Sequence, residues 1–309
     1  MGGGHEHGSR SPLRPDLSKY ALVAIGAGVL TIGLKVAAWL LTGSVGLLSD
    51  AAESSVNLVA AIGAYVALKV AARPADSDHN FGHTKAEYFS AVLEGVMIVV
   101  AAGVIIVSAV NRLFAPQELE QVGVGLAISV LATVINGAVG VYLVRVGRTN
   151  RSLALQADGK HLLTDVWTTV GVILGVLLVA LTGWLPLDPI IAIAVALNIL
   201  VVGTRLVWQS GAGLLDAALP EEERARIDEV LDRHRADGVE FHDVRTRESG
   251  HERFVQMHML VPGVWTVDRA HDLAEQVEQE LAALFADLRT TIHTEPLDDP
   301  RAYESWRLN

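Results

Sequence analysis

Two polar clusters lie inside apolar segments of membrane length and share a four-residue spacing. Glu53 and Asn57 occupy one segment, and His161 and Asp165 occupy a later one. Residues four apart on a helix share a face, so each pair can point at a neighbouring helix. Ionisable groups at membrane depth are costly and mark an ion path, a proton relay or a ligand site. This pattern predicts a divalent-metal site and favours metal transport.

The exact register of the first pair stays open, because Asp50 and Ser54 have the same spacing. Asp50 and Asn57 could also be packing residues that hydrogen-bond across a helical bundle. For His161 and Asp165, the sequence offers no basic neighbour inside the membrane segments, so we expect a bound cation to compensate them.

A second candidate metal site lies in the connection after the second segment. Asp76, His79 and His83 bring one carboxylate and two imidazoles into a short stretch, a ligand set that suits zinc. An ordinary polar loop is the alternative.

A third candidate site lies in the last 90 or so residues. His242, His258 and His293 fall on predicted strands with Glu295, and His271 begins a predicted helix. Imidazole plus carboxylate is a common Zn²⁺ ligand set. Each histidine could instead be exposed or hydrogen-bonded without a metal.

The elements that position the first clusters are predicted membrane helices. The chain has 309 residues and 51% apolar content, which is high for a soluble domain. Six segments reach the roughly 20 residues that a bilayer core requires: 18–41, 44–72, 88–111, 121–144, 161–182 and 187–209. The sequence therefore predicts six transmembrane helices, which makes the lipid bilayer a partner.

Basic residues predict the orientation, because short cytoplasmic flanks collect Lys and Arg. One side of the predicted bundle holds only Arg112, and all the other flanking basic residues fall on the opposite side: Arg10, Arg14, Lys19, Lys69, Arg73, Lys85, Arg145, Arg148, Arg151, Lys160 and Arg205. Both termini should be cytoplasmic in a multi-pass cell-membrane protein. The first 17 residues are polar, so we expect no cleaved signal peptide.

The part of the chain that follows the predicted membrane helices is predicted to form an acidic soluble domain. Residues 217–309 carry 11 Lys and Arg against 21 Asp and Glu, within a chain of net charge −11. This charge should repel nucleic acid and attract cations. The chain has no cysteine, so any metal site must use histidine, carboxylate, amide or water.

Periodicity in the soluble part predicts a small α+β domain. Helical patterns at 221–235 and 267–285 alternate with strand patterns at 241–246, 254–261 and 289–294. The order αββαβ suits a ferredoxin-like sandwich. We expect an N-terminal tail over 1–17, a membrane domain over 18–213, a cytoplasmic metal-binding and dimerisation domain over 214–296 and a C-terminal tail over 297–309.

Several longer motifs are distributed along the chain: Thr42-Gly43-Ser44-Val45, the run from Asp76 to Glu87, Ala157-Asp158 with His161 and Asp165, the run from Leu214 to Glu223, the run from His242 to Arg247, and Ile292-His293. Together they resemble the cation diffusion facilitator family, most closely its bacterial zinc and ferrous-iron efflux branch. The similarity covers nearly the whole chain.

The resemblance implies a homodimer that exports a divalent metal from the cytoplasm in exchange for protons. It places the transport site on Glu53, Asn57, His161 and Asp165, with Asp50 one turn earlier. It also implies a loop site at Asp76, His79 and His83, and a cytoplasmic metal cluster at His242, His258, His271, His293 and Glu295. Lys85 and Asp216 match a charge pair at the dimer interface.

One departure from the family pattern concerns the metal. Related zinc transporters usually place an aspartate, or a His and an Asp, at the second-helix pair, whereas this chain has Glu53 and Asn57. The neutral amide of Asn57 cannot carry a proton. Asn-containing sites suggest Mn²⁺, whereas His161 argues for Zn²⁺, Fe²⁺ or Co²⁺. Zn²⁺ is the first expectation and Mn²⁺ the alternative, with Cd²⁺ also in the range.

The proton should be carried by His161, whose reference pKa of about 6.5 is nearest cytoplasmic pH, with Glu53 as the second candidate. The soluble cluster is better placed to sense metal and bias the dimer than to carry it. An intramembrane zinc hydrolase would show a His-Glu-x-x-His helix, which the membrane segments lack, so we expect no enzyme. A metal sensor without transport is the remaining alternative.

Overall fold

The computed structural model describes residues 16–42, 45–114, 124–184, 186–236 and 238–303. Some side chains inside these ranges are not described, and those of Asp50 and Glu53 are among them. The chain divides into two compact units, a helical unit up to Ala212 and a C-terminal unit from Gly213. Each unit is considered by itself.

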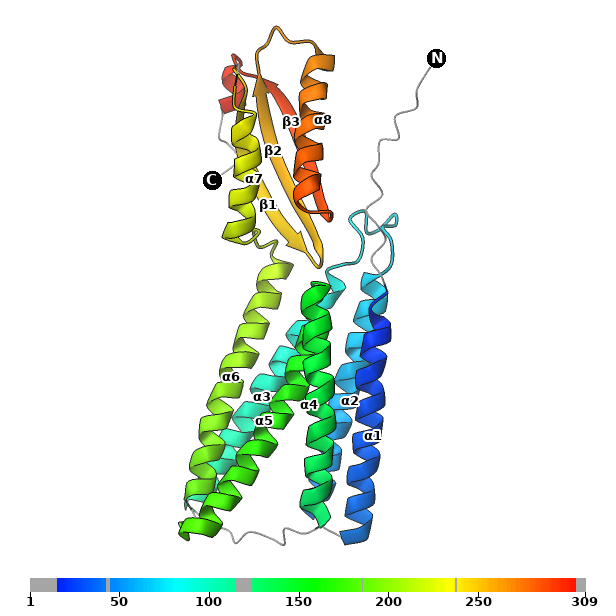
Figure 1. Ribbon diagram of the computed structural model, residues 1–309, viewed down its shortest axis with the longest axis vertical. Coiled ribbons are helices and arrows are strands. Elements are labelled where there is room, and N and C mark those ends of the chain that lie inside the picture. The colour runs from blue at the N-terminus through cyan, green and yellow to red at the C-terminus, as the bar shows by residue number, and fades with distance from the viewer. Residues whose placement is uncertain (1–15, 43–44, 115–123, 185, 237, 304–309) are drawn as a thin grey trace. The chain divides into compact units, whose positions relative to one another are not determined.

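The helical unit consists of six long helices (Figure 1). Each has 25 to 30 residues, or about 38 to 45 Å at 1.5 Å per residue, enough to cross a bilayer core of about 30 Å. They are α1 (Ser18–Thr42), α2 (Val45–Ala71), α3 (Ala86–Phe114), α4 (Val124–Thr149), α5 (Leu153–Thr182) and α6 (Leu187–Leu214).

Among the described residues, four stretches are long and apolar enough to cross a membrane: Ser18–Ala37, Ala86–Phe114, Val130–Thr149 and Pro189–Leu214. These stretches belong to α1, α3, α4 and α6, so the predicted multi-pass helical fold is confirmed. The two other helices, α2 and α5, carry the polar clusters. Membrane crossing by these two stays a prediction.

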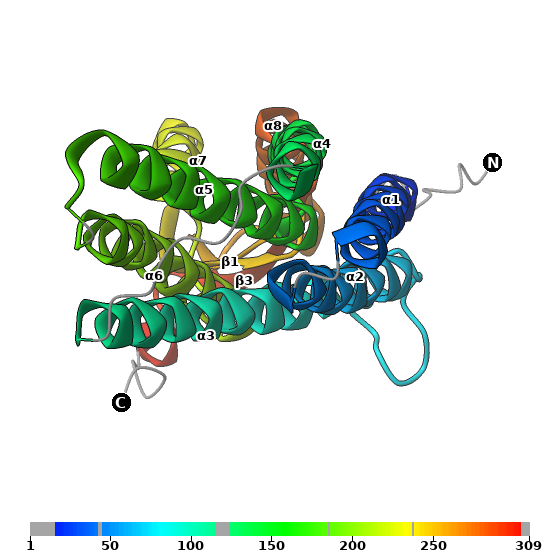
Figure 2. The ribbon, with the colours of Figure 1, turned by 90° about the horizontal axis from the view of Figure 1, so that it is seen from below.

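Small residues let the helices of the bundle, seen end-on in Figure 2, approach one another closely. A Cβ added to Gly159 of α5 would lie 2.8 Å from the carbonyl oxygen of Gly140 on α4. On α6, a Cβ at Gly203 would lie 2.8 Å from Cγ2 of Ile98 on α3. Such close backbone contacts are typical of helix packing in membranes. They fix the spacing of the helices that hold the polar residues.

The C-terminal unit has the predicted element order. It contains α7 (Glu221–Arg233), β1 (Glu240–Ser249), β2 (Glu252–Val261), α8 (Val267–Leu284), β3 (Leu288–Pro296) and a short 3₁₀ helix (Pro300–Tyr303). The sheet order is β1-β2-β3, with β1 antiparallel and β3 parallel to β2. The predicted αββαβ order is confirmed.

Both helices of this unit contribute to a single core with the sheet. Alternate residues of β2, Val255, Met257 and Met259, are buried in one cluster with Ile227 of α7 and Val277 of α8. Successive side chains of a strand point to opposite faces. His258 of β2 therefore lies on the face away from the two helices.

Candidate metal centres

In the helical unit, one amide joins the two predicted pairs. Asn57 of α2 donates from Nδ2 to Oδ2 of Asp165 on α5, at 2.5 Å. Its Oδ1 lies 2.9 Å from Nε2 of His161, one turn earlier on α5. The structure thus brings three of the four predicted transport-site residues together, although Asn57 lies 104 residues before His161 and 108 residues before Asp165 in the sequence.

The fourth residue, Glu53, is one turn before Asn57 on the same helix α2, and Asp50 precedes it by three residues. The side chains of both fall outside the described part of the chain, so the choice between Asp50 and Glu53 as ligand stays a prediction. Ser54, the partner in the alternative spacing, is buried.

The bond from His161 has a consequence for metal binding. Because Oδ1 of Asn57 can only accept, Nε2 of His161 must carry the hydrogen. A metal ion needs a nitrogen without a proton as its ligand. Coordination through Nε2 therefore requires the Asn57 bond to break.

A basic residue does lie inside a membrane span, which corrects the expectation that there is none. Lys35 belongs to the candidate span Ser18–Ala37 and is only 8% exposed. Its Nζ donates to Oγ of Ser54 on α2 at 2.6 Å. The rule that predicts orientation considers only the basic residues that flank a span, so it does not consider a single lysine within an apolar run. Lys35 therefore reaches α2, the helix that carries Asn57.

The start of α5 is held by a carboxylate from α3. Glu87 is fully buried, and its Oε2 accepts hydrogen bonds from the Ser152 hydroxyl and from the backbone N–H of Ala154, at 3.3 Å for the latter. Ser152 also caps the helix by accepting from the N–H of Leu155. A carboxylate at a helix N-terminus is favourable for the unpaired N–H groups there. This contact positions α5, two to three turns before His161.

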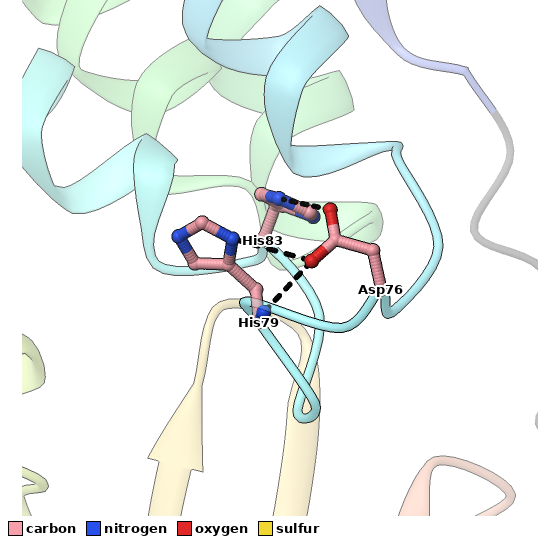
Figure 3. Close-up of side chains that lie close together, drawn as sticks. All are labelled: Asp76, His79 and His83. Carbon is pink, nitrogen blue, oxygen red and sulfur yellow. Dashed lines mark hydrogen bonds and ion pairs between the residues drawn. The ribbon is translucent and has the colours of Figure 1, made fainter.

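The predicted loop residues also come together (Figure 3). Asp76 Oδ1 accepts from the backbone N–H of His79 at 2.7 Å and lies 3.4 Å from its Nδ1, while Oδ2 lies 3.4 Å from Nε2 of His83. The ligand atoms of the three residues are all within 4.8 Å of one another. One metal ion fits between such groups.

Backbone hydrogen bonds keep the Asp76 carboxylate of the loop in its ionised form. Hydrogen bonds from the backbone N–H groups of His79 and Asp78, with His79 the larger contributor, lower the pKa of Asp76 below its ordinary value. Gly82 takes a φ of +81°, which closes the turn that returns His83 to Asp76. The carboxylate is therefore ionised at neutral pH, as a metal ligand must be.

In the C-terminal unit, three histidines form a row across the sheet. His242 of β1 is the register partner of His258 on β2, and His258 is the register partner of His293 on β3. Neighbouring ring centres are 5.1 and 5.0 Å apart. Glu295 Oε2 lies 3.4 Å from Nε2 of His242 and 3.2 Å from Nδ1 of His258. His242, His258 and Glu295 have ligand atoms close enough to share one metal ion.

Two further residues bear on this cluster. His271 lies on α8, which packs on the other face of the sheet, so within one chain the structure does not bring it to the row. Asp243 follows His242 at a strand irregularity with a φ of +50°, and its Oδ2 lies 3.9 Å from Nε2 of His258. Sequence reasoning missed Asp243, because the irregularity changes which face its side chain takes.

The two residues of the predicted charge pair, Lys85 and Asp216, belong to different units. Asp216 accepts a hydrogen bond from Nη1 of Arg247 at 3.0 Å within the C-terminal unit. Lys85 belongs to the helical unit. Pairing of Lys85 with Asp216 stays a prediction.

Two family models together match most of the chain. The cation efflux transmembrane domain matches residues 21–215, and the cytoplasmic domain of cation efflux proteins matches residues 219–297.

Individual relatives cover most of the chain. An uncharacterised transporter of Synechocystis is 49% identical over 92% of this chain and 92% of its own length. The cation-efflux pump FieF of Serratia proteamaculans is 35% identical over 89% of this chain and 91% of its own. Among solved structures, the metal-bound C-terminal domain of the CzcD transporter from Thermotoga maritima is 32% identical, covers 26% of this chain and 92% of that chain, and has a TM-score of 0.24.

Proposed function

Because this chain belongs to the cation diffusion facilitator family, we propose that it exports a divalent metal ion from the cytoplasm in exchange for protons. The observation that carries the proposal is the Asn57 bridge, which joins His161 and Asp165 of α5 to α2 in the bundle. Carboxylate, imidazole and amide groups at membrane depth suit an ion that is bound and then released.

The transport site consists of Glu53, Asn57, His161 and Asp165, with Asp50 one turn away. A metal ion binds the neutral imidazole of His161, so binding to the doubly protonated ring releases one proton. The same residues then bind metal from the cytoplasmic side of the membrane and protons from the opposite side, in alternation. Glu53 is the second proton carrier.

Zn²⁺ is the proposed cargo, with Fe²⁺, Co²⁺ and Cd²⁺ as related ions. Imidazole favours these borderline metals, and His161 supplies one. The alternative within the family is Mn²⁺, for which the neutral oxygen of Asn57 is the supporting feature.

The C-terminal unit is proposed as a cytoplasmic metal-binding domain of a homodimer, with both chain termini in the cytoplasm. Residues 217–309 are strongly acidic, so two copies repel each other. Metal at the row of His242, His258 and His293 with Glu295 screens that repulsion. Metal binding to the C-terminal unit then favours the approach of the two copies within the dimer.

Proteoliposomes under a pH gradient test the proposal. Zn²⁺, Fe²⁺, Co²⁺, Mn²⁺ and Cd²⁺ are offered to the unmodified chain and to Asp165→Ala, and internal metal and pH are followed together. We expect Zn²⁺ flux, coupled proton movement in the opposite direction, and loss of both in Asp165→Ala. Mn²⁺ as the sole transported ion would make Asn57 the selectivity determinant.

A metal sensor without transport is the second candidate, supported by the three-histidine row. It predicts metal binding by the purified protein with no flux of any ion. His161→Ala separates the roles further: proton-coupled transport that survives this change would remove His161 as proton carrier.

A further inference from the structure

Two carboxyl groups outside the proposed transport site lie buried between α3 and α5. Glu94 on α3 is 1% exposed and Asp158 on α5 is 2% exposed. The two helices pack against each other, and the two groups are close enough to interact electrostatically. Within the described residues, neither forms an ion pair with a basic side chain.

Each of these carboxyl groups keeps an oxygen without a hydrogen-bond partner among the described residues. The atoms are Oε2 of Glu94 and Oδ2 of Asp158, and both are fully enclosed. The only bond found for the pair in these ranges is a long one of 3.4 Å, from the Ser90 hydroxyl to Oε1 of Glu94. Buried polar atoms are normally satisfied, so one unpaired oxygen on each of two interacting carboxyl groups points to a bound ligand.

Asp158 connects this pair with the proposed transport site. It lines a cavity of about 10 Å³, the room of roughly one water molecule, together with polar side chains of Asn57, Ser54 and Asn136. Asp158 is one turn before His161 on α5. With 1.5 Å of rise per residue, it lies about 10 Å before Asp165 along the helix axis.

We propose that Glu94 and Asp158 form a second cation site, in which a divalent metal ion pauses between one end of the bundle and the transport site. α3 and α5 both begin at that end, as the contact of Glu87 with Ser152 and Ala154 shows. Two carboxylates balance the charge of a divalent ion, and water completes the ligand set. Without imidazole, the site binds Zn²⁺ more weakly than the transport site does, so the ion moves on.

Binding is tested on the full-length chain in detergent. The background variant Asp165→Ala, His83→Ala and His258→Ala removes one ligand from each of the other three proposed sites. Mn²⁺ is the probe, because it prefers oxygen ligands and its free form is counted by electron paramagnetic resonance. We expect one Mn²⁺ per chain, and a loss of affinity of about tenfold or more when Glu94→Gln or Asp158→Asn is added, as expected when a charged metal ligand is removed.

Ser90→Ala is the matched control, since it alters the same buried cluster without removing a carboxylate. It should keep the bound Mn²⁺. Absence of Mn²⁺ from the background variant, or binding that both carboxyl substitutions leave unchanged, overturns the site. A shift in the pH dependence of flux without any bound Mn²⁺ means that the pair holds a proton, and this also overturns it.

The pausing role rests on the proposed export function and is tested by flux. With all other sites intact, Glu94→Gln and Asp158→Asn should each lower Zn²⁺ flux about tenfold or more. The Co²⁺ absorption of the His161-containing site should stay unchanged. Normal flux in both variants overturns the pausing role, while loss of flux in Asp165→Ala would still support export. No flux even in the unmodified chain would instead remove the export function.

Discussion

The side-chain amide of Asn57 and the carboxylate of Asp165 are joined across α2 and α5 by a hydrogen bond of 2.5 Å. The same amide lies 2.9 Å from the His161 ring. A neutral residue thus holds the two α5 groups in place without adding charge. In the metal-free protein this avoids the repulsion that a third carboxylate would bring.

Asn57→Asp should trade stability of the empty site for metal affinity. An ionised aspartate cannot donate to Asp165, so the melting temperature of the metal-free protein should fall. With Zn²⁺ bound, the added charge faces the ion, and affinity should rise about tenfold or more, which corresponds to at least about 1.4 kcal/mol. Thermal unfolding with and without Zn²⁺ measures both effects.

Asn136→Asp is the control for that change. Asn136 is a buried amide on α4 that lines the same cavity but is not a proposed ligand. Equal gains in Zn²⁺ affinity from both substitutions would contradict a ligand role for Asn57.

Gly159→Ala should loosen the contact of α4 with α5. The new methyl group would lie 2.8 Å from the Gly140 carbonyl oxygen and 2.9 Å from the Val144 backbone nitrogen, so the helices must separate. We expect a loss of about 1 to 3 kcal/mol in stability, with reduced flux because α5 carries His161 and Asp165. Gly33→Ala in α1, where nothing lies within 4 Å of the added atom, should leave both unchanged. Matching melting temperatures for the two variants would refute this account.

Arg253→Ala should destabilise the C-terminal unit. Arg253 is nearly buried, and its guanidinium binds Glu223 at 2.7 Å and Asp287 at 2.5 Å. Removing the cation leaves two carboxylates uncompensated, which costs about 3 kcal/mol for buried pairs. Arg301→Ala breaks the exposed pair with Asp299 and should cost much less, because solvent screens an exposed ion pair. Thermal melts of the two variants side by side provide the comparison, and a similar loss in both would argue against burial as the cause.

The contact between Asp16 and Lys69 should give a pH-dependent increment of stability. Hydrogen bonds from Lys69, then from Ser18, lower the pKa of Asp16 from 3.8 to about 2. Its contribution is therefore complete above about pH 4 and is lost as the pH falls toward 2. Both side chains are about half exposed, so Asp16→Asn should cost less than about 1 kcal/mol at pH 7 and clearly less at pH 2, where the Asp16 carboxyl is about half protonated. Denaturant titrations at both pH values check this, and an equal cost at each would exclude the ion pair as its source.

Metal removal should act through the histidine row. A chelator should lower the melting temperature of the unmodified chain, because metal that binds only the folded form stabilises it. His258→Ala should remove this response. His271→Ala should keep most of it, since His271 lies on the opposite face of the sheet from the row. A lost response in His271→Ala would mean that the site draws on more than one face.

The C-terminal fold followed from local patterns. Alternation along 241–246 and 254–261 and helical spacing along 221–235 and 267–285 each reflect one face of an element against one core. The strands extend beyond the predicted limits, because β1 and β2 continue pairing up to Ser249 and Glu252, where the chain turns. Propensity does not set the end of such a ladder; the partner strand does.

The polar clusters were visible in sequence because charges are rare in apolar segments. Glu94 carries the same signal inside the predicted span 88–111 but was not singled out, and Asp158, three residues before His161, was named only as part of a family motif. Their significance depends on a contact between α3 and α5, across 64 residues of chain, that no local spacing encodes.

The sequence by itself determined the six long helices, the αββαβ order and the four-residue faces that carry Asn57, His161 and Asp165, because these depend on periodicity along one element. Only the tertiary structure decided that Asn57 bridges His161 and Asp165, that Lys35 reaches Ser54, and that three histidines share one row. These relationships depend on helix packing and strand register. Both are set by contacts between residues far apart in the chain.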